Sequence, residues 1–239
     1  MDGSVKLQRG RRGRRLPYPW PPYPAVVGAK GHTKPSETIR GVLDGWGIDV
    51  SDESIVWYLL DTYPERCFYL DKWPMVIGDK YDQVEIEVQW ILRSGQGWEA
   101  LFDLEARCRS VMTKLWLYNE VRAEALVFGN KWARRMRRTL DKAARRRLRS
   151  LPRSRAWDLG RRVEDLGSVI VEDVRHLALL VQLGARDIAD TLYCLLDYQM
   201  IICPGGSGLI VYFHDIGKLD VVTAIAASDG LFVRPRTDD

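Results

Sequence analysis

The residues with the clearest potential for chemistry are His214 and Asp215, the first two residues of the sequence HDIGK. An imidazole and a carboxylate are common ligands of divalent metal ions, and a bound metal can activate water for the hydrolysis of a phosphate ester. His176 lies upstream and could supply a second imidazole. Since the chain contains three histidines in all, such a site would have no spare imidazole ligands.

The sequence HDIGK is similar to the His-Asp-x-Gly-Lys signature of HD phosphohydrolases, whose His and Asp side chains hold a divalent metal. The resemblance implies that His214 and Asp215 are metal ligands and that His176 is the first His ligand. That family places the pair on a helix, whereas here it follows a Gly-rich hairpin pattern. We therefore keep a metal-dependent phosphohydrolase as an alternative, and expect a protein that is not an enzyme, with no catalytic residue, metal or cofactor.

Positive charge is concentrated in two short segments. Residues 1–15 contain six Lys and Arg against one acidic residue, and residues 131–155 contain twelve against one. These segments carry +5 and +11, so the other 199 residues carry −12 of the total of +4. Such separation of charge favours a polyanionic partner, and arginine favours bidentate contacts with phosphate. The expected polyanion-binding residues are Arg11, Arg12, Arg14, Arg15, Lys131, Arg134, Arg135, Arg137, Arg138, Lys142, Arg145, Arg146, Arg147 and Arg149.

The expected polyanion is a nucleic acid, with RNA preferred, or the surface of an anionic membrane. No base-reading motif accompanies the arginines, so contact should be independent of sequence. The alternative is a solvated basic helix, or one that pairs with acidic residues of its own chain. A basic helix that meets the acidic part of a second copy would also produce a homo-oligomer.

The sequence LPYPWPPYP at residues 16–24 has five prolines in nine residues, which is typical of polyproline II. Such a segment can bind a WW- or SH3-type domain. It can equally act as a stiff spacer that packs Trp20 on the body of the protein.

A basic arm followed by Pro/Tyr-rich sequence, and then by a strand, turn and helix pattern at residues 84–111, resembles the viral matrix proteins of rhabdoviruses. In that family a Pro-Pro-x-Tyr late motif recruits the host budding machinery. The similar residues here are Pro21, Pro22, Tyr23 and Pro24, with the tyrosine one place early. Beyond residue 128 the sequence becomes helical and Arg-rich where those proteins have strands. The resemblance implies a structural protein of a virion, matrix-like or nucleocapsid-like.

Hydrophobic spacing predicts mostly helices. Alternation of apolar residues, broken at Ile91, predicts one strand over 83–93. β-branched and aromatic residues around a Pro-Gly-Gly-Ser-Gly turn predict a hairpin over 200–213. Helices are expected from Ser36 to Gly45, before Pro64, over 98–128, over 130–150, and two or three times between 157 and 199.

We therefore expect a predominantly helical α+β protein. Residues 174–213 also resemble the later half of a winged helix, with a helix ending at Gly184, another over 186–198 and a hairpin wing; this suggests a nucleic-acid-binding regulator as a second alternative. The four expected parts are a disordered basic and Pro-rich arm (1–30), an α+β region (31–128), an exposed basic helix (129–155) and a helical region with a C-terminal hairpin (156–239).

Composition excludes several other classes. A chain that is 46% hydrophobic with 24 aromatic residues is not disordered throughout, and four cysteines are too few for a disulfide scaffold, so buried thiols are expected. No apolar run approaches the ~20 residues of a membrane span, and the start lacks the apolar region of a secretory signal. We expect an intracellular protein, of cytoplasm, nucleus or virion.

Overall fold

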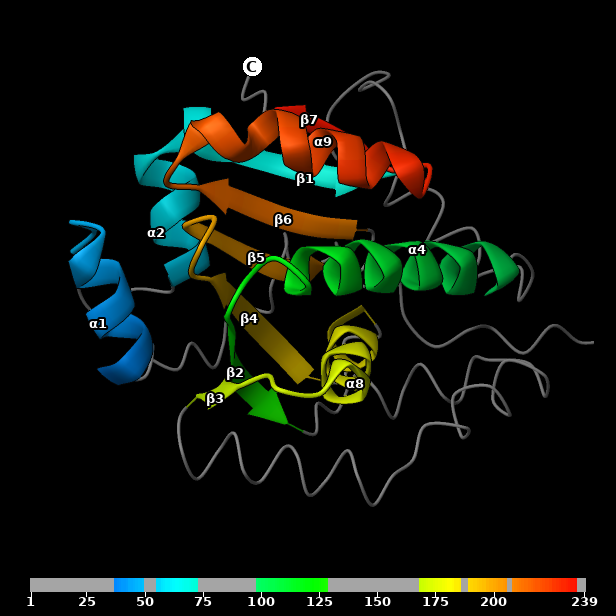
Figure 1. Ribbon diagram of the computed structural model, residues 1–239, viewed down its shortest axis with the longest axis horizontal. Coiled ribbons are helices and arrows are strands. Elements are labelled where there is room, and N and C mark those ends of the chain that lie inside the picture. Colours follow the sequence, from blue (N-terminus) through cyan, green and yellow to red (C-terminus); the bar gives the residue numbers. More distant parts are fainter. Residues whose placement is uncertain are drawn as a thin grey trace, which may run out of the picture.

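The computed structural model describes residues 37–49, 55–72, 98–128, 168–185, 189–205 and 208–235. These residues form a seven-stranded antiparallel sheet in the order β3-β2-β4-β5-β6-β1-β7, with five α-helices packed around it (Figure 1). The strands are β1 (Cys67–Asp71), β2 (Val121–Phe128), β3 (Val169–Ile170), β4 (Ala189–Leu195), β5 (Met200–Gly205), β6 (Gly208–Phe213) and β7 (Phe232–Pro235). The helices are α1 (Glu37–Gly45), α2 (Ile55–Thr62), α4 (Trp98–Trp116), α8 (Val174–Ala185) and α9 (Leu219–Ser228), with two 3₁₀ turns, η1 (Pro64–Arg66) and η2 (Ile216–Lys218).

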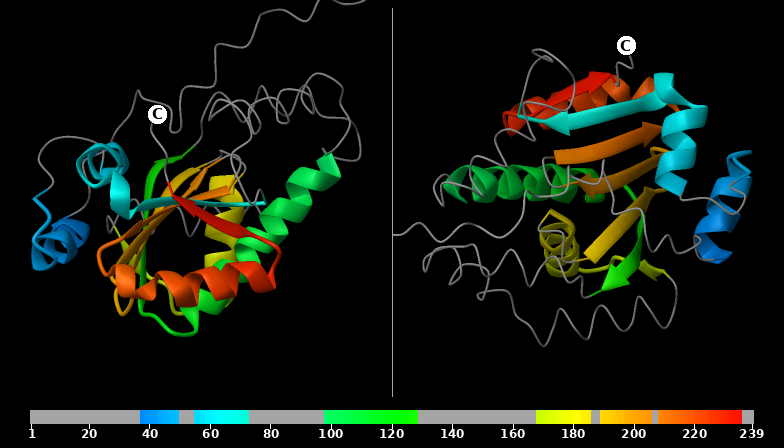
Figure 2. Two further views of the ribbon diagram at one scale, coloured as in Figure 1. Left: turned by 90° about the horizontal axis from the view of Figure 1, so that it is seen from above. Right: turned by 180° about the vertical axis from the view of Figure 1, so that it is seen from behind.

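Helices cover both faces of this sheet. Viewed along the sheet, α4, α8 and α9 lie on one side and α1 and α2 on the other (Figure 2). Because successive strand residues point to opposite faces, paired residues of neighbouring strands form two ladders. One ladder runs through Ala123, Tyr193, Ile202, Val211 and Phe68 toward α4, and the other through Cys194, Ile201, Tyr212 and Cys67 toward α1 and α2.

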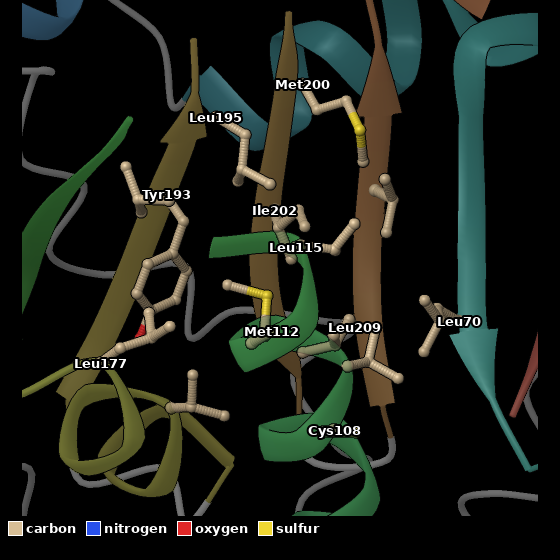
Figure 3. Packing of buried hydrophobic residues seen from close by; sticks show 14 of the residues in the cluster. Leu70, Cys108, Met112, Leu115, Leu177, Tyr193, Leu195, Met200, Ile202 and Leu209 are labelled. Atoms are coloured by element: carbon tan, nitrogen blue, oxygen red, sulfur yellow. The ribbon is translucent and has the colours of Figure 1, made fainter. Parts of the chain in front are cut away.

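The larger core lies between the sheet and α4. Cys108, Met112 and Leu115 recur at intervals of three and four residues, so they occupy one stripe of the helix, and all three are at most 2% exposed (Figure 3). Tyr193 lies against the same core with no exposed surface. Fully burying an aliphatic side chain of this size contributes about 1.5–3 kcal/mol, so this face supplies much of the driving force for folding.

A second, smaller core lies under α1 and α2. In α1, Ile39 and Leu43 are one helical turn apart and fully buried. The helix ends in a tight turn, in which Gly47 has φ +72° and the Ile48 amide donates to the Leu43 carbonyl at 2.9 Å. This turn presents Trp46 at the end of the helix, beside the sheet.

The prediction of a predominantly helical fold is wrong, because the sheet is the element that every helix packs against. The helix expected over 186–198 is instead β4, the third strand of the sheet from one edge. All five residues from Thr191 to Leu195 are buried, since helices cover both faces of the strand. A strand covered on both faces is apolar throughout and loses the alternation that identifies strands in a sequence.

The helix expected over 98–128 is half correct. Helix α4 ends at Trp116, and residues 121–128 form β2. Asn119 ends the helix, because its Nδ2 donates to the Leu115 carbonyl at 2.8 Å and its Oδ1 accepts from the Tyr198 amide at 2.9 Å. The sequence of β2 is rich in Ala, Glu and Leu, which favour helix in isolation, and strand pairing with β4 overrides that preference.

Other expectations are confirmed, missed or outside the described residues. Helix α1, helix α2, helix α8 and the β5–β6 hairpin lie where the sequence predicted them. Strands β1 and β7 and helix α9 were not predicted. The arm of residues 1–30, the strand of 83–93 and the basic helix of 129–155 fall outside the described residues.

Candidate functional site

The expected polyanion-binding residues lie in the ranges 11–15 and 131–149, and the late-motif-like residues are Pro21, Pro22, Tyr23 and Pro24. All of them fall outside the described residues. His214, a candidate metal ligand from the sequence, lies within the described residues, in a cluster of aromatic and charged side chains.

His214 and Asp215 follow β6 in a turn and lie on no α-helix. The Asp215 side chain caps η2, because its Oδ1 accepts a hydrogen bond from the Gly217 amide at 2.9 Å. Lys218 lies over the Tyr198 ring, 5.8 Å from its centroid. The sequence HDIGK is thus explained by turn and capping chemistry, in which Asp accepts from the backbone two residues on.

A metal site at this turn finds no support in the described residues. Helix α8, which carries His176, packs on the α4 face of the sheet, whereas His214 stacks on Trp46, which packs against the core under α1 and α2. Across the described ranges no three His, Cys, Asp or Glu side chains come together as metal ligands. The winged-helix alternative fails for a separate reason, because its second helix is strand β4.

Two groups of aromatic rings lie on this face of the sheet, one of which contains His214. Its imidazole stacks on the Trp46 indole with centroids 5.8 Å apart and an angle of 18° between the planes. Tyr63, in the loop after α2, contacts the Tyr212 ring at 5.9 Å and the Tyr58 ring of α2 at 6.4 Å. We call these five residues, together with Arg66 of η1, the Trp46–His214 cluster.

Arg66 joins the two halves of this cluster. Its Nη1 donates to the His214 carbonyl at 3.3 Å, and its guanidinium lies over the Tyr63 ring at 5.9 Å. The turn is held from the other side as well, because the His214 amide donates to the Gln199 carbonyl at 2.9 Å. Residues 148 positions apart along the chain therefore meet at one end of the sheet.

Burial and Arg66 together control ionisation in the cluster. Burial lowers the pKa of His214 below its usual value of 6.5, and the positive charge of Arg66 lowers it further, against a smaller opposing effect of Asp215. Burial also raises the pKa of the Tyr212 hydroxyl, an effect that Arg66 partly offsets. At neutral pH His214 is therefore uncharged and Tyr212 protonated. Among the described residues, neither His214 Nδ1 nor the Tyr212 hydroxyl has a hydrogen-bond partner of good geometry.

No protein-family model, curated protein or solved structure matches this chain.

Beside Tyr212, a small apolar hollow lies between α2 and the sheet. Its lining includes Leu59, Cys67, Cys203 and Ile210. All four cysteines of the chain are buried and none forms a disulfide, as the sequence suggested. Burial raises the pKa of Cys108 to about 12, and it raises that of Cys194 as well, so neither thiol forms the nucleophilic thiolate at neutral pH.

Most residues of the cluster could not be identified from the sequence alone. Trp46 carried a local signal, since a large aromatic residue between Gly45 and Gly47 lies in the turn that ends a helix. Tyr63, Arg66 and Tyr212 carried none, because their contacts depend on the pairing of β1 with β6.

None of the helices in the described ranges combines the length and the apolar character that a membrane span requires.

Proposed function

We propose that the protein is a non-enzymatic assembly protein that binds polyanions through its basic segments, residues 1–15 and 131–155. The observation that carries the proposal is the separation of charge. The described residues contain ten Lys and Arg against eighteen Asp and Glu, a net charge of −8, so the rest of the chain carries +12.

The basic residues of the fold have partners of their own. Six of the ten form ion pairs with acidic residues of the described part, namely Arg66, Arg107, Lys114, Arg122, Arg175 and Arg234. The fold therefore presents an acidic surplus, and a polyanion would be repelled from it. The arginines of the two basic segments are left to make the phosphate contacts.

The ligand class follows from the chemistry of these segments. Clustered arginines bind phosphates bidentately and without reading bases, so the ligand is RNA, DNA or an anionic lipid surface, with RNA preferred. This activity suits a matrix-like or nucleocapsid-like protein that acts in the cytoplasm, the nucleus or a virion. The segment 16–24 would then add a WW-type, SH3-type or budding-machinery partner.

The test is a binding series with labelled single-stranded RNA, duplex DNA and anionic liposomes over a range of salt concentrations. The variant carries Arg134→Glu, Arg135→Glu, Arg137→Glu and Arg138→Glu, and its matched control carries Arg→Glu at Arg107 and Arg175, which lie in the fold. The affinity of wild type should fall steeply as salt rises. For duplex DNA, the four-Glu variant should have a shallower slope of log K against log salt, smaller in magnitude by about 3–4, at about 0.9 per lost phosphate contact. Equal binding by wild type and variant, or no binding to any ligand, would refute the proposal.

Self-association is a separate consequence of the same charge separation. A basic segment of one copy can lie on the acidic fold of another, which would form a homo-oligomer that salt dissociates. The four-Glu variant alone should then sediment as a smaller species than wild type at low salt. Oligomers of undiminished size in that variant would exclude this mode of assembly.

A further inference from the structure

The Trp46–His214 cluster presents a surface of half-exposed aromatic rings. Trp46, Tyr58, Tyr63 and His214 are each partly exposed, and they come from the end of α1, from α2, from the loop after it and from the turn after β6. These rings form two contacting pairs, Trp46 with His214 and Tyr58 with Tyr63, and each ring restricts the motion of its partner. A ligand that lies across them would lose little additional side-chain entropy.

The same surface carries hydrogen-bond donors beside two carboxylates, that of Glu65, which pairs with Arg66, and that of Asp49 near Tyr58. Arg66 offers guanidinium N–H groups, Trp46 an indole N–H, and Tyr58 a hydroxyl. Burial and the neighbouring Tyr63 raise the pKa of Tyr58, whose hydroxyl already lies within hydrogen-bond reach of Tyr63 and Thr62. Aromatic rings together with N–H and O–H donors match a proline-rich peptide, which has apolar rings and backbone carbonyls but few N–H groups of its own.

The chain itself carries such a peptide close by. Residues 16–24 contain five prolines with Tyr18, Trp20 and Tyr23 between them. Twelve residues, 25–36, connect this segment to the start of α1, and they reach up to about 40 Å at ~3.3 Å per residue. Helix α1, whose end presents Trp46, spans only about 13 Å at ~1.5 Å per residue. A short tether of this kind gives a local concentration in the millimolar range.

We propose that residues 16–24 bind the Trp46–His214 cluster of their own chain in a polyproline II conformation. The contact occludes the Pro/Tyr-rich segment from WW- or SH3-type domains until a competing partner displaces it. It also holds the basic residues 1–15 at the α1 end of the fold. The proposal is independent of polyanion binding, which rests on the arginines.

The experiment uses the full chain with the photo-crosslinking residue p-benzoylphenylalanine in place of Trp20, at low micromolar concentration. After irradiation, the protein of monomer mass is digested and the crosslinked peptides are identified by mass spectrometry. We expect crosslinks to residues 37–49 and 55–66. Pro21→Ala with Pro22→Ala should reduce them at least threefold, because it removes the polyproline II preference, whereas Val26→Ala with Val27→Ala in the tether should leave them unchanged.

A second pair of variants changes the surface instead of the arm. Tyr58→Ala removes a half-exposed ring of the cluster, and Phe232→Ala removes a 40% exposed ring at the far end of β1. Tyr58→Ala should reduce the crosslinks at least threefold and Phe232→Ala should not, with thermal unfolding by circular dichroism to confirm that both fold. Crosslinks that join two chains, that spread over the whole surface, or that survive both Tyr58→Ala and the proline variants would overturn the proposal. If Tyr58→Ala does not fold, the comparison of the proline variant with the Val26→Ala, Val27→Ala control is sufficient to test the contact.

Discussion

The imidazole of His214 is a titratable group that lies at the contact between the end of α1 and the sheet. Its imidazole stacks on Trp46 at the end of α1, while its backbone is held by Arg66 and Gln199. The neutral ring can lie half-buried near the Arg66 guanidinium, whereas the charged ring would be repelled from it. The folded protein therefore disfavours protonation of this residue.

Stability should consequently fall as the pH falls below the ordinary histidine value of 6.5. Unfolded chains take up the proton near that value and folded chains only at lower pH, so acid favours the unfolded state across this interval. His214→Phe retains a ring that can stack on Trp46 and should lose less stability between pH 7.5 and 5.5 than wild type. Urea unfolding at both pH values measures this, with His176→Phe as control. An equal loss in wild type and His214→Phe would show that the ring is not the titrating group.

The turn after β6 is stabilised at the level of the element, by the cap that Asp215 places on η2. Asp215→Ala removes the acceptor and should lower the free energy of unfolding by about 0.5–2 kcal/mol, as measured in urea. Asn caps as well as Asp, so Asp215→Asn should retain stability. The Asn variant also tests the phosphohydrolase alternative, since phosphatase activity present in wild type and lost in a stable Asp215→Asn protein would restore the metal-site interpretation.

Helix α8 approaches the sheet closely at a glycine. A Cβ on Gly184 would lie 2.7 Å from Thr191 Oγ1 and 2.8 Å from Pro204 Cβ, both on strands beneath the helix. Gly184→Ala should therefore destabilise the protein by about 1–3 kcal/mol through overpacking. The control is Gly41→Ala in α1, where a Cβ meets nothing within 4 Å and should stabilise by about 0.5–1 kcal/mol. Similar effects at the two positions would contradict the packing of α8.

The whole molecule combines an acidic fold, whose basic residues largely have partners, with basic segments outside the described residues. Reversing the charge of Arg134, Arg135, Arg137 and Arg138 should therefore change the free energy of unfolding by less than about 0.5 kcal/mol at physiological salt, the range expected of substitutions that remove no stabilising contact. The same change should abolish most polyanion binding. A large loss of stability in denaturant unfolding would instead show that these arginines pair with their own fold.

Arg234→Ala is the matched comparison for that experiment. Arg234 pairs with Asp71 between β7 and β1, and the two side chains are only 13% and 6% exposed. Removing Arg234 leaves a buried carboxylate without this partner, which should cost about 3–5 kcal/mol. The two variants thus separate charge that stabilises the fold from charge available to a ligand.

The sequence by itself determined those elements whose signals are local. Ile39 and Leu43 one helical turn apart, with glycines after them, were sufficient to place α1, and the Pro-Gly-Gly-Ser-Gly turn placed the β5–β6 hairpin. The separation of charge is likewise a property of the sequence. Each of these features involves residues close together along the chain.

The tertiary structure decided the rest. Residues 191–195 are buried on both sides because helices lie on both faces of the sheet, and no local sequence pattern indicates that the second face is covered. The chain could not reveal that Trp46, Arg66 and His214 meet either, because strand pairing brings them together across as many as 168 positions. Where neighbouring strands are far apart in the sequence, tertiary packing determines the strand order of the sheet. The same packing determines which side chains meet on its surfaces.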